Sequence, residues 1–235
     1  MRDSLYTGMR VLLAGALALA LIPVASARKG KHPTDLTEIL SDMNEASKRL
    51  KTVSANLEYT KVTVLVDDKS TESGQLFYRK GKTTEIRIDI QKPERKILLF
   101  KKNKGEMYLP KINQIQEYNL EQKSDLVQQF LLLGFGTDAG ELKKAYAVTY
   151  LKEEELEGDT TVLLELVPRK GNAGGQISKI QLWVNEESWL PAQQKFFENG
   201  GDYLIARYSG VKVNRILPGS TFELDASGAK RVKMN

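Results

Sequence analysis

The chain is poor in the side chains that most often perform enzymatic chemistry. It contains no cysteine and one histidine, His32, which lies near the N-terminus in a stretch rich in glycine, lysine and proline. Without cysteine, disulfides, thiol catalysis and thiolate metal sites are excluded. A Ser–His–Asp triad needs its histidine inside the folded domain. We therefore expect no histidine-based catalysis and no metal site.

The remaining short motifs are better explained by turns and strands than by catalysis. The sequence Gly134-Phe135-Gly136 does not extend to the G-x-G-x-x-G of nucleotide-binding loops, because Gly140 comes one residue late. An S-x-x-K motif at residues 209–212 places its Ser and Lys on opposite faces of a predicted strand. The acidic run at 153–157 lacks the spacing of an EF-hand and is typical of a solvated turn. The sequence therefore predicts a protein that is not an enzyme and uses no cofactor.

The composition is typical of a folded domain that does not bind nucleic acid. Of 235 residues, 28% are charged and 41% hydrophobic. The formal net charge of +5 is mild and is not gathered on one helix. The most basic stretch, residues 92–111, has seven Lys and Arg against two Glu. It is interpreted either as a solvated hairpin edge that lysines protect from aggregation or as a docking surface for an acidic partner.

The first 27 residues have the pattern of a secretory signal peptide. Two arginines accompany an apolar run at 11–22, which is followed by the small-residue site at 25–27. A transmembrane anchor is the alternative, but twelve helical residues span about 18 Å, less than a hydrocarbon core about 30 Å thick. Cleavage after Ala27 predicts a periplasmic protein with a single domain, residues 28–235.

Apolar residues at helical spacing predict two amphipathic helices. The first covers residues 36–50, where Asp35 can cap the N-terminus. The second covers residues 122–133, which contain neither proline nor glycine and end at Gly134. A further helical turn is predicted at 141–144.

Alternating polar and apolar residues predict a sheet of about eleven short strands. The clearest strand is residues 84–91, in which three isoleucines alternate with polar side chains. The last short strand is predicted at 221–224. The predicted fold class is α+β, with one large antiparallel sheet and helices on one side of it. The apolar stripes leave open whether these helices cover a packed core or a hollow that binds an apolar ligand.

The order of these elements, and of several short motifs within them, resembles a known family. A signal peptide and an amphipathic helix precede a long strand, and the resemblance extends over residues 36–224. The motifs are Gly74-Gln75-Leu76-Phe77-Tyr78-Arg79-Lys80, Ile86-Arg87-Ile88, Pro93, Met107-Tyr108-Leu109-Pro110, residues 114–118, residues 163–168, Ile180-Gln181-Leu182-Trp183-Val184, Leu190-Pro191 and Phe222. They resemble the periplasmic carriers of outer-membrane lipoproteins, the LolA type, and the wider lipoprotein-sorting group.

The resemblance implies an open, strongly curved antiparallel sheet, an incomplete β-barrel, with helices as a lid over an apolar cavity. In this family the cavity takes the acyl chains of lipoproteins released from the inner membrane. The carrier then passes them to an outer-membrane receptor. The expected partners are acylated lipoproteins, an inner-membrane transporter that releases them and an outer-membrane receptor, and the carrier is expected to be a monomer.

The resemblance also implies roles for individual apolar residues. The lipid-binding wall of the cavity is expected to consist of Leu76, Tyr78, Ile86, Ile88, Ile90, Leu98, Phe100, Met107 and Leu109. The lid is expected to consist of Leu36, Leu40, Met43, Leu126, Phe130 and Leu133. Burial of acyl methylenes, at about 0.8 kcal/mol each, would drive binding.

A basic residue is expected to gate the cavity. In carriers of this type it follows the G-x-L strand, usually as Arg before Pro, and reaches the lid helices. The matching stretch here is Arg79-Lys80-Gly81, in which Gly81 replaces the proline. Arg79 and Lys80 are both gate candidates, and a solvated basic strand end is the alternative interpretation.

Two other functions remain open for the same fold. One is a carrier of free lipid or glycolipid. The other is a periplasmic regulator that senses lipoproteins and binds a membrane-anchored signalling protein. Such regulators usually have a further domain after the sheet, whereas the last element predicted here ends near Phe222. This favours the carrier.

Overall fold

The computed structural model describes residues 35–120, 133, 135–136, 138–169 and 176–234. They belong to one compact unit, Pro33–Asn235. The predicted signal peptide and most of the second predicted helix lie outside the described residues, so both stay predictions. In the part of the chain that is described, no helix is long and apolar enough to cross a membrane.

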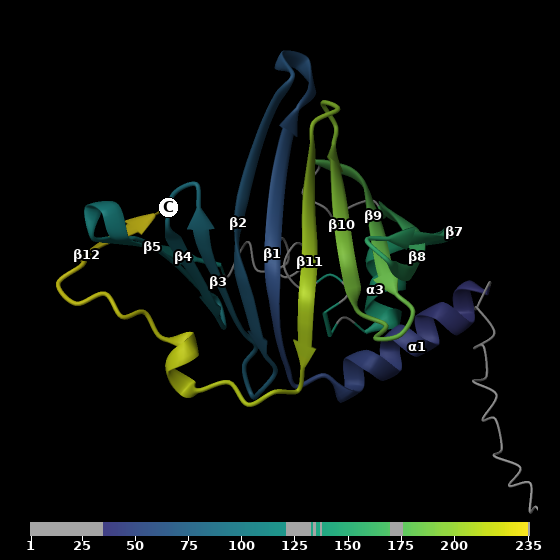
Figure 1. The fold of residues 1–235 in the computed structure, drawn as a ribbon, viewed down its shortest axis with the longest axis horizontal. Coiled ribbons are helices and arrows are strands. Elements are labelled where there is room, and N and C mark those ends of the chain that lie inside the picture. Colours follow the sequence, from purple (N-terminus) through teal and green to yellow (C-terminus); the bar gives the residue numbers. More distant parts are fainter. Residues whose placement is uncertain (1–34, 121–132, 134, 137, 170–175, 235) are drawn as a thin grey trace, which may run out of the picture. The chain divides into compact units, whose positions relative to one another are not determined.

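Twelve strands form one open sheet that is not closed into a barrel (Figure 1). Their order is β12-β6-β5-β4-β3-β2-β1-β11-β10-β9-β8-β7. The strands are β1 (Thr52–Thr63), β2 (Asp68–Arg79), β3 (Glu85–Lys92), β4 (Lys96–Lys101), β5 (Lys104–Leu109), β6 (Gln114–Asn119), β7 (Tyr146–Leu156), β8 (Asp159–Pro168), β9 (Ile177–Asn185), β10 (Pro191–Glu198), β11 (Tyr203–Val213) and β12 (Lys230–Met234). The predicted open sheet is therefore confirmed.

The C-terminal end of the chain differs from the prediction in two ways. The short strand predicted at 221–224 falls on the 3-10 helix η3 (Gly219–Phe222), where the prediction was wrong. The last strand is instead β12, which pairs with β6 in parallel and makes the sheet mixed. Phe222 is buried at the end of η3, so packing of its ring competes with an extended conformation there.

Two helices are described besides short 3-10 turns. Helix α1 (Leu36–Arg49) begins after Asp35, whose side chain accepts a hydrogen bond from the Thr37 N–H, as predicted for the N-cap. Helix α3 (Ala139–Ala145) includes the predicted turn at 141–144 and is capped by Asp138. The 3-10 turns η1 (Val64–Val66) and η2 (Pro110–Ile112) join β1 to β2 and β5 to β6.

The strand register defines two faces of the sheet, because residues directly opposite each other in neighbouring strands point to the same side. We call the inner face the one that includes Leu76, which lies opposite Ile88, which in turn lies opposite Leu98. The outer face includes Phe77, opposite Arg87, which lies opposite Leu99.

Buried apolar residues of the inner face form two clusters. The first cluster joins α1, α3 and β7–β10, and its members are Ile39, Leu40, Met43, Leu133, Leu142, Tyr146, Val162, Leu164, Leu166, Ile177, Ile180, Leu182, Val184 and Phe196. The second cluster joins the end of α1 to β1–β3 and β11, and its members are Ala46, Leu50, Val53, Ala55, Leu57, Leu76, Tyr78, Ile86, Ile88, Ile90, Phe135, Leu190, Ala206 and Tyr208. Helix α1 therefore spans both clusters.

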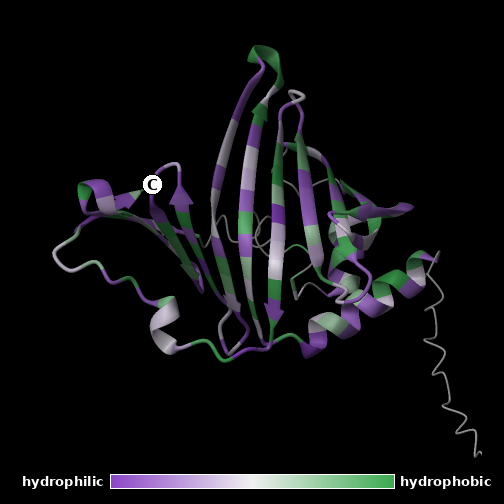
Figure 2. Cartoon of the chain, in the orientation of Figure 1, coloured by the Kyte–Doolittle hydropathy of each residue, from purple (hydrophilic) through white to green (hydrophobic). Residues whose placement is uncertain are grey.

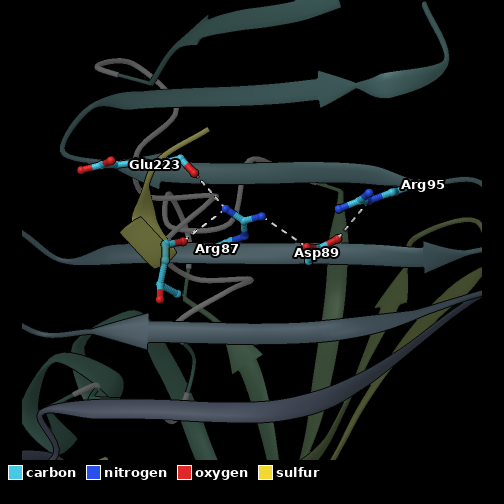
Figure 3. Close-up of polar contacts among 5 residues, drawn as sticks. Arg87, Asp89, Arg95 and Glu223 are labelled. Atoms are coloured by element: carbon cyan, nitrogen blue, oxygen red, sulfur yellow. Dashed lines mark hydrogen bonds and ion pairs between the residues drawn. The ribbon is translucent and has the colours of Figure 1, made fainter. Parts of the chain in front are cut away.

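Residues 214–229, which we call the C-terminal strap, run from β11 to β12 and contact the outer face of β3. The guanidinium of Arg87 donates hydrogen bonds to the carbonyl oxygens of Glu223, at 2.9 Å, and Thr221, at 3.3 Å, and pairs with Asp89 at 3.2 Å (Figure 3). On the outer face of the neighbouring strand β4, Leu99 is buried. The C-terminal strap therefore covers part of the outer face of the sheet at β3.

Candidate functional site

All nine residues predicted to form the lipid-binding wall lie on the inner face. The register places Tyr78 opposite Ile86, and Ile86 opposite Phe100. It places Leu98 opposite Met107. Ile90, opposite Gly74, and Leu109, two residues after Met107, belong to the same face. The structure thus brings together side chains from β2, β3, β4 and β5 into one apolar surface.

Burial within this surface falls from β2 and β3 toward β5. Leu76, Tyr78, Ile86, Ile88 and Ile90 are all buried members of the second cluster. The other four wall residues are half-buried, and they are Leu98, Phe100, Met107 and Leu109. Within the part of the chain that the structure describes, neither buried cluster includes a residue of β5 or β6. The half-buried part of the wall is the candidate contact surface for an apolar ligand.

Close approach of backbones positions the buried part of the wall. A Cβ at Gly74 would lie 2.0 Å from the carbonyl oxygen of Asp89, so a side chain there would push β2 away from β3. The register of the two strands also shifts between Ser73 and Gly74. Glycine at this position therefore lets Leu76 and Tyr78 lie tightly beside Ile86 and Ile88.

The predicted lid residues of α1 lie over the other half of the sheet. Leu40 and Met43 are buried in the first cluster, and Leu36 packs against it from a half-buried position. Leu133 belongs to the same cluster, whereas Leu126 and Phe130 lie outside the described residues. The described lid residues therefore contact β7–β10, whereas Ala46 of α1 and Leu50, the C-cap of that helix, join the second cluster.

A buried polar network connects Leu133 to the sheet. Gln194, whose side chain is fully buried on β10, donates a hydrogen bond from Nε2 to the carbonyl oxygen of Leu133. The hydroxyl of Tyr208 on β11 donates to Oε1 of Gln194 at 3.1 Å. The ring of Phe135 meets the ring of Tyr208 edge to face, with 4.9 Å between centroids. Sequence analysis missed this anchor, because a glutamine inside a strand is usually a sign of the solvated face.

Tyr78 of the wall lies close to Gly136. A Cβ at Gly136, whose φ is +79°, would lie 2.8 Å from the Tyr78 hydroxyl oxygen. Gly136 therefore has both a left-handed backbone and no room for a side chain. Burial raises the pKa of Tyr78 above its ordinary value, an effect that a hydrogen bond with Thr84 partly offsets. The neutral phenol is thus the form that faces this surface.

The two gate candidates lie at the C-terminal end of β2 and contact opposite sides of the sheet. Arg79 belongs to the outer face, where its Nε donates to Glu85 at 2.7 Å and its guanidinium lies 4.3 Å from the centre of the Phe222 ring. Lys80 instead donates from Nζ to the carbonyl oxygen of Ser47, at 3.3 Å, near the C-terminal end of α1. Because α1 covers the inner face, Lys80 is the better placed candidate.

On the outer face, Arg79 belongs to an ion-pair cluster centred on Glu85. Burial opposes ionisation of Glu85, but hydrogen bonds from Lys101 and Arg79 outweigh it and hold its pKa below the ordinary value. The two ion pairs are both 2.6 Å long. Their strand positions, 79, 85 and 101, are directly opposite one another. Arg79 therefore acts as a cross-strand partner on the outer face.

A polar rim borders the inner face near the β1–β2 turn. Lys96 of β4 donates to Glu72 of β2 at 2.6 Å, and both side chains are half-buried. Burial raises the pKa of the nearby Tyr59 phenol, and the charges of Glu72 and Glu198 raise it further. The apolar surface thus changes to polar side chains at this end.

The basic stretch at 92–111 is largely paired with acidic groups. Besides the Lys96 and Lys101 pairs, Lys111 lies 3.0 Å from Glu94 and Arg95 lies 3.9 Å from Asp89. These contacts support the interpretation of a solvated hairpin edge. In the described ranges, no group of three or more His, Cys, Asp and Glu side chains is arranged to hold a metal ion.

A protein-family model described as an uncharacterized protein matches residues 90–217, which are 128 of the 235 residues. The chain belongs to that family. The family region includes the half-buried wall on β4 and β5 and the strands of the first cluster. A comparison with curated proteins gives no match.

Several solved structures resemble the chain at low sequence identity. An uncharacterized conserved protein from Thermus thermophilus matches with a TM-score of 0.56 and 12% identity over 84% of this chain and 98% of that chain. MucB matches with a TM-score of 0.55 and 14% identity over 83% of this chain, which spans 64% of MucB. A LolA superfamily protein from Nitrosomonas europaea matches with a TM-score of 0.40 and 17% identity over 80% of this chain and 97% of that chain. At such identities the likeness to the Thermus thermophilus protein and to MucB shows the fold alone.

Proposed function

We propose that this protein is a periplasmic carrier that binds the acyl chains of lipoproteins on its inner face and moves them toward the outer membrane. The observation that carries the proposal is the apolar wall of β2–β5, which is buried at Leu76 and Ile88 but only half-buried at Leu98 and Met107. An acyl chain on β4 and β5 would remove the remaining apolar surface from water. This burial would favour binding by about 25 cal/mol of free energy per Å².

The arrangement of the helices supports loading at this end of the sheet. The described helices α1 and α3 pack into the first cluster over β7–β10, and α1 reaches the second cluster only with its last turn. A ligand on β4 and β5 would therefore not have to displace the contacts that bury the first cluster. Acyl binding and folding stability are served by different parts of one sheet.

The wall should be tested by photo-crosslinking in cells from two adjacent positions. A photoreactive amino acid at Met107 points to the inner face, and one at Tyr108 points to the outer face, where it lies opposite Ile97 and Ile115. Both side chains are half-buried, so the pair is matched. We expect acylated lipoproteins to be recovered by mass spectrometry from position 107 and not from position 108. Equal recovery from both positions, or none from a folded 107 variant, would contradict the proposal.

A regulator that binds another protein is the second candidate. The likeness to MucB favours it, because MucB of Pseudomonas aeruginosa has been solved in complex with MucA. Recovery from position 107 of free lipid or glycolipid alone would assign the chain to lipid transport. Recovery of a membrane-anchored protein without acyl chains would favour the regulator.

A further inference from the structure

Three consecutive aliphatic residues at the apex of the β1–β2 hairpin are exposed. Leu65 is 93% exposed, Val66 66% and Val64 53%. They form the 3-10 turn η1, and Figure 2 shows this turn as a hydrophobic end on a hairpin that reaches beyond the neighbouring strands. A hairpin turn is usually made of Gly, Asn, Asp or Pro, which suit turn geometry and water. The fold itself does not require aliphatic residues here.

The apex is held in place by its neighbours. Strands β1 and β2 stay paired up to Thr63 and Asp68. The N–H of Val64 donates to a carboxylate oxygen of Asp202, at 2.9 Å, in the turn between β10 and β11. The N–H of Asp67 donates back to the carbonyl oxygen of Val64 at 3.3 Å. These two hydrogen bonds fix both ends of the turn, and the side chain of Leu65 between them is exposed to solvent.

We propose that the apex, Val64–Val66, inserts into the surface of a lipid bilayer. A stable protein–protein interface needs about 800 Å² on each partner, from about 20–30 residues, which three side chains at the end of a hairpin cannot supply. A bilayer surface can bury a small protruding group in the boundary between headgroups and acyl chains. Size therefore favours a membrane over a protein as the occupant.

The charges beside the apex predict which lipids it needs. Lys61 and Lys69 flank it on β1 and β2, Asp67 and Asp68 follow it directly, and Asp202 accepts a hydrogen bond from the Val64 N–H, so the formal charge of these five residues is −1. Attraction to anionic headgroups would require an excess of Lys and Arg. Binding through this apex should therefore occur on zwitterionic lipid and depend little on salt, although the whole chain is basic.

The chain offers a matched control for the experiment. Ile216 is 97% exposed, and it lies just beyond the end of β11, where Asn214 N–H donates to the carbonyl oxygen of Thr52 at the start of β1. It is therefore near the opposite end of β1 from the apex. Leu65→Asp and Ile216→Asp each replace one exposed aliphatic side chain by the same carboxylate.

The test is flotation of the purified protein with phosphatidylcholine vesicles that contain no lipoprotein, at low and high salt. We expect the wild type and Ile216→Asp to float with the vesicles, and Leu65→Asp to bind about tenfold or more weakly. Equal binding by both variants, or binding that needs anionic lipid and disappears in salt, would overturn the proposal. Absence of binding by the wild type would overturn it as well.

A second measurement locates the contact. Because the chain has no cysteine, Leu65→Cys and Ile216→Cys each accept one environment-sensitive fluorophore. We expect a blue shift with vesicles at position 65 only, and an equal shift at both positions would contradict insertion of the apex. The inference goes beyond the proposed function, because Leu65 lies outside the apolar wall of the inner face, so that Leu65→Asp changes the apex and leaves the proposed acyl-binding surface intact.

Discussion

The inner face of the sheet is packed differently in its two halves. In the β7–β10 half, Val162, Leu164, Leu182 and Val184 are fully buried beneath α1 and α3. In the β3–β6 half, burial decreases from Ile88 on β3 to half-buried side chains on β4 and β5. The difference teaches that one continuous sheet can bury its apolar residues completely in one half and leave them partly exposed in the other. The proposed function assigns folding stability to the tightly packed half and acyl binding to the half-buried half.

Truncation of one leucine in each half should separate the two roles most strongly. Leu182→Ala creates a cavity in the first cluster and should lower the free energy of unfolding by about 2–5 kcal/mol. Leu98→Ala removes a half-buried side chain and should cost about 1 kcal/mol but weaken acyl binding. Urea unfolding and titration with a lipopeptide measure both effects. If both variants lost the same stability and bound the lipopeptide equally well, the two halves of the sheet would not have different roles.

Alkaline pH should lower the free energy of unfolding, because two tyrosines are buried on the inner face in their neutral form. Burial raises the pKa of Tyr146 to about 12 and also raises the pKa of Tyr208. In the unfolded chain these phenols lose their protons near pH 10, whereas in the fold Tyr146 keeps its proton up to about pH 12. The contribution of Tyr146 to stability is therefore complete below pH 10 and is lost between pH 10 and 12.

This pH dependence can be measured by unfolding the wild type and Tyr146→Phe at several pH values. We expect the free energy of unfolding of the wild type to fall from pH 10 to 12, and that of Tyr146→Phe to fall less steeply. The slope, and not the value at neutral pH, is the readout. Identical slopes would show that Tyr146 does not contribute to the alkaline loss.

Loss of the Tyr208 hydroxyl should have a smaller effect. Tyr208→Phe leaves Oε1 of the fully buried Gln194 without this donor, which should cost about 1–3 kcal/mol. Tyr203→Phe is a matched control, because Tyr203 is a half-buried residue of the same strand and Lys195 contacts its ring face, which phenylalanine keeps. Thermal unfolding compares them. A Tyr208→Phe variant as stable as the control would show that the hydrogen bond between Tyr208 and Gln194 does not stabilise the fold.

The smallest effects are expected at the two gate candidates. Lys80→Ala removes a cation near the C-terminal end of α1 and should cost about 0.3–1 kcal/mol, because cations stabilise that end of a helix. It should also speed the release of a bound lipopeptide to vesicles. Arg79→Leu should leave the release rate unchanged, because Arg79 pairs with Glu85 on the outer face. A faster release from Arg79→Leu alone would reverse the assignment.

Much of the fold was predictable because its strands follow simple periodicities. Ile86, Ile88 and Ile90 alternate with polar residues and lie on the inner face, and Asp35 caps α1. The run at 97–100 is apolar throughout, because Leu98 faces inward while Leu99 is buried on the outer face. A run that is apolar throughout does not show which of its side chains point to the inner face. The strand register is needed to assign them.

Other features depend on contacts between distant parts of the chain. Strand β12 has no alternating pattern, and its parallel pairing with β6 follows from the path of the C-terminal strap. The network of Gln194 and Tyr208 joins two strands to the carbonyl oxygen of Leu133. Neither the pairing of β12 nor this network can be predicted from local sequence propensity. The same holds for the position of Leu40 and Met43 over β7–β10 and not over the predicted wall.

The most direct test of the two-halves account is a lipopeptide titration read at neighbouring positions of β5. Met107→Cys and Tyr108→Cys each carry one environment-sensitive label in a chain that otherwise lacks cysteine, and the labels point to the inner and the outer face. We predict a saturable blue shift from the label at 107 when a triacylated lipopeptide is added, and none from the label at 108. No shift at 107 in a folded protein, or the same shift at both positions, would contradict acyl binding on the inner face.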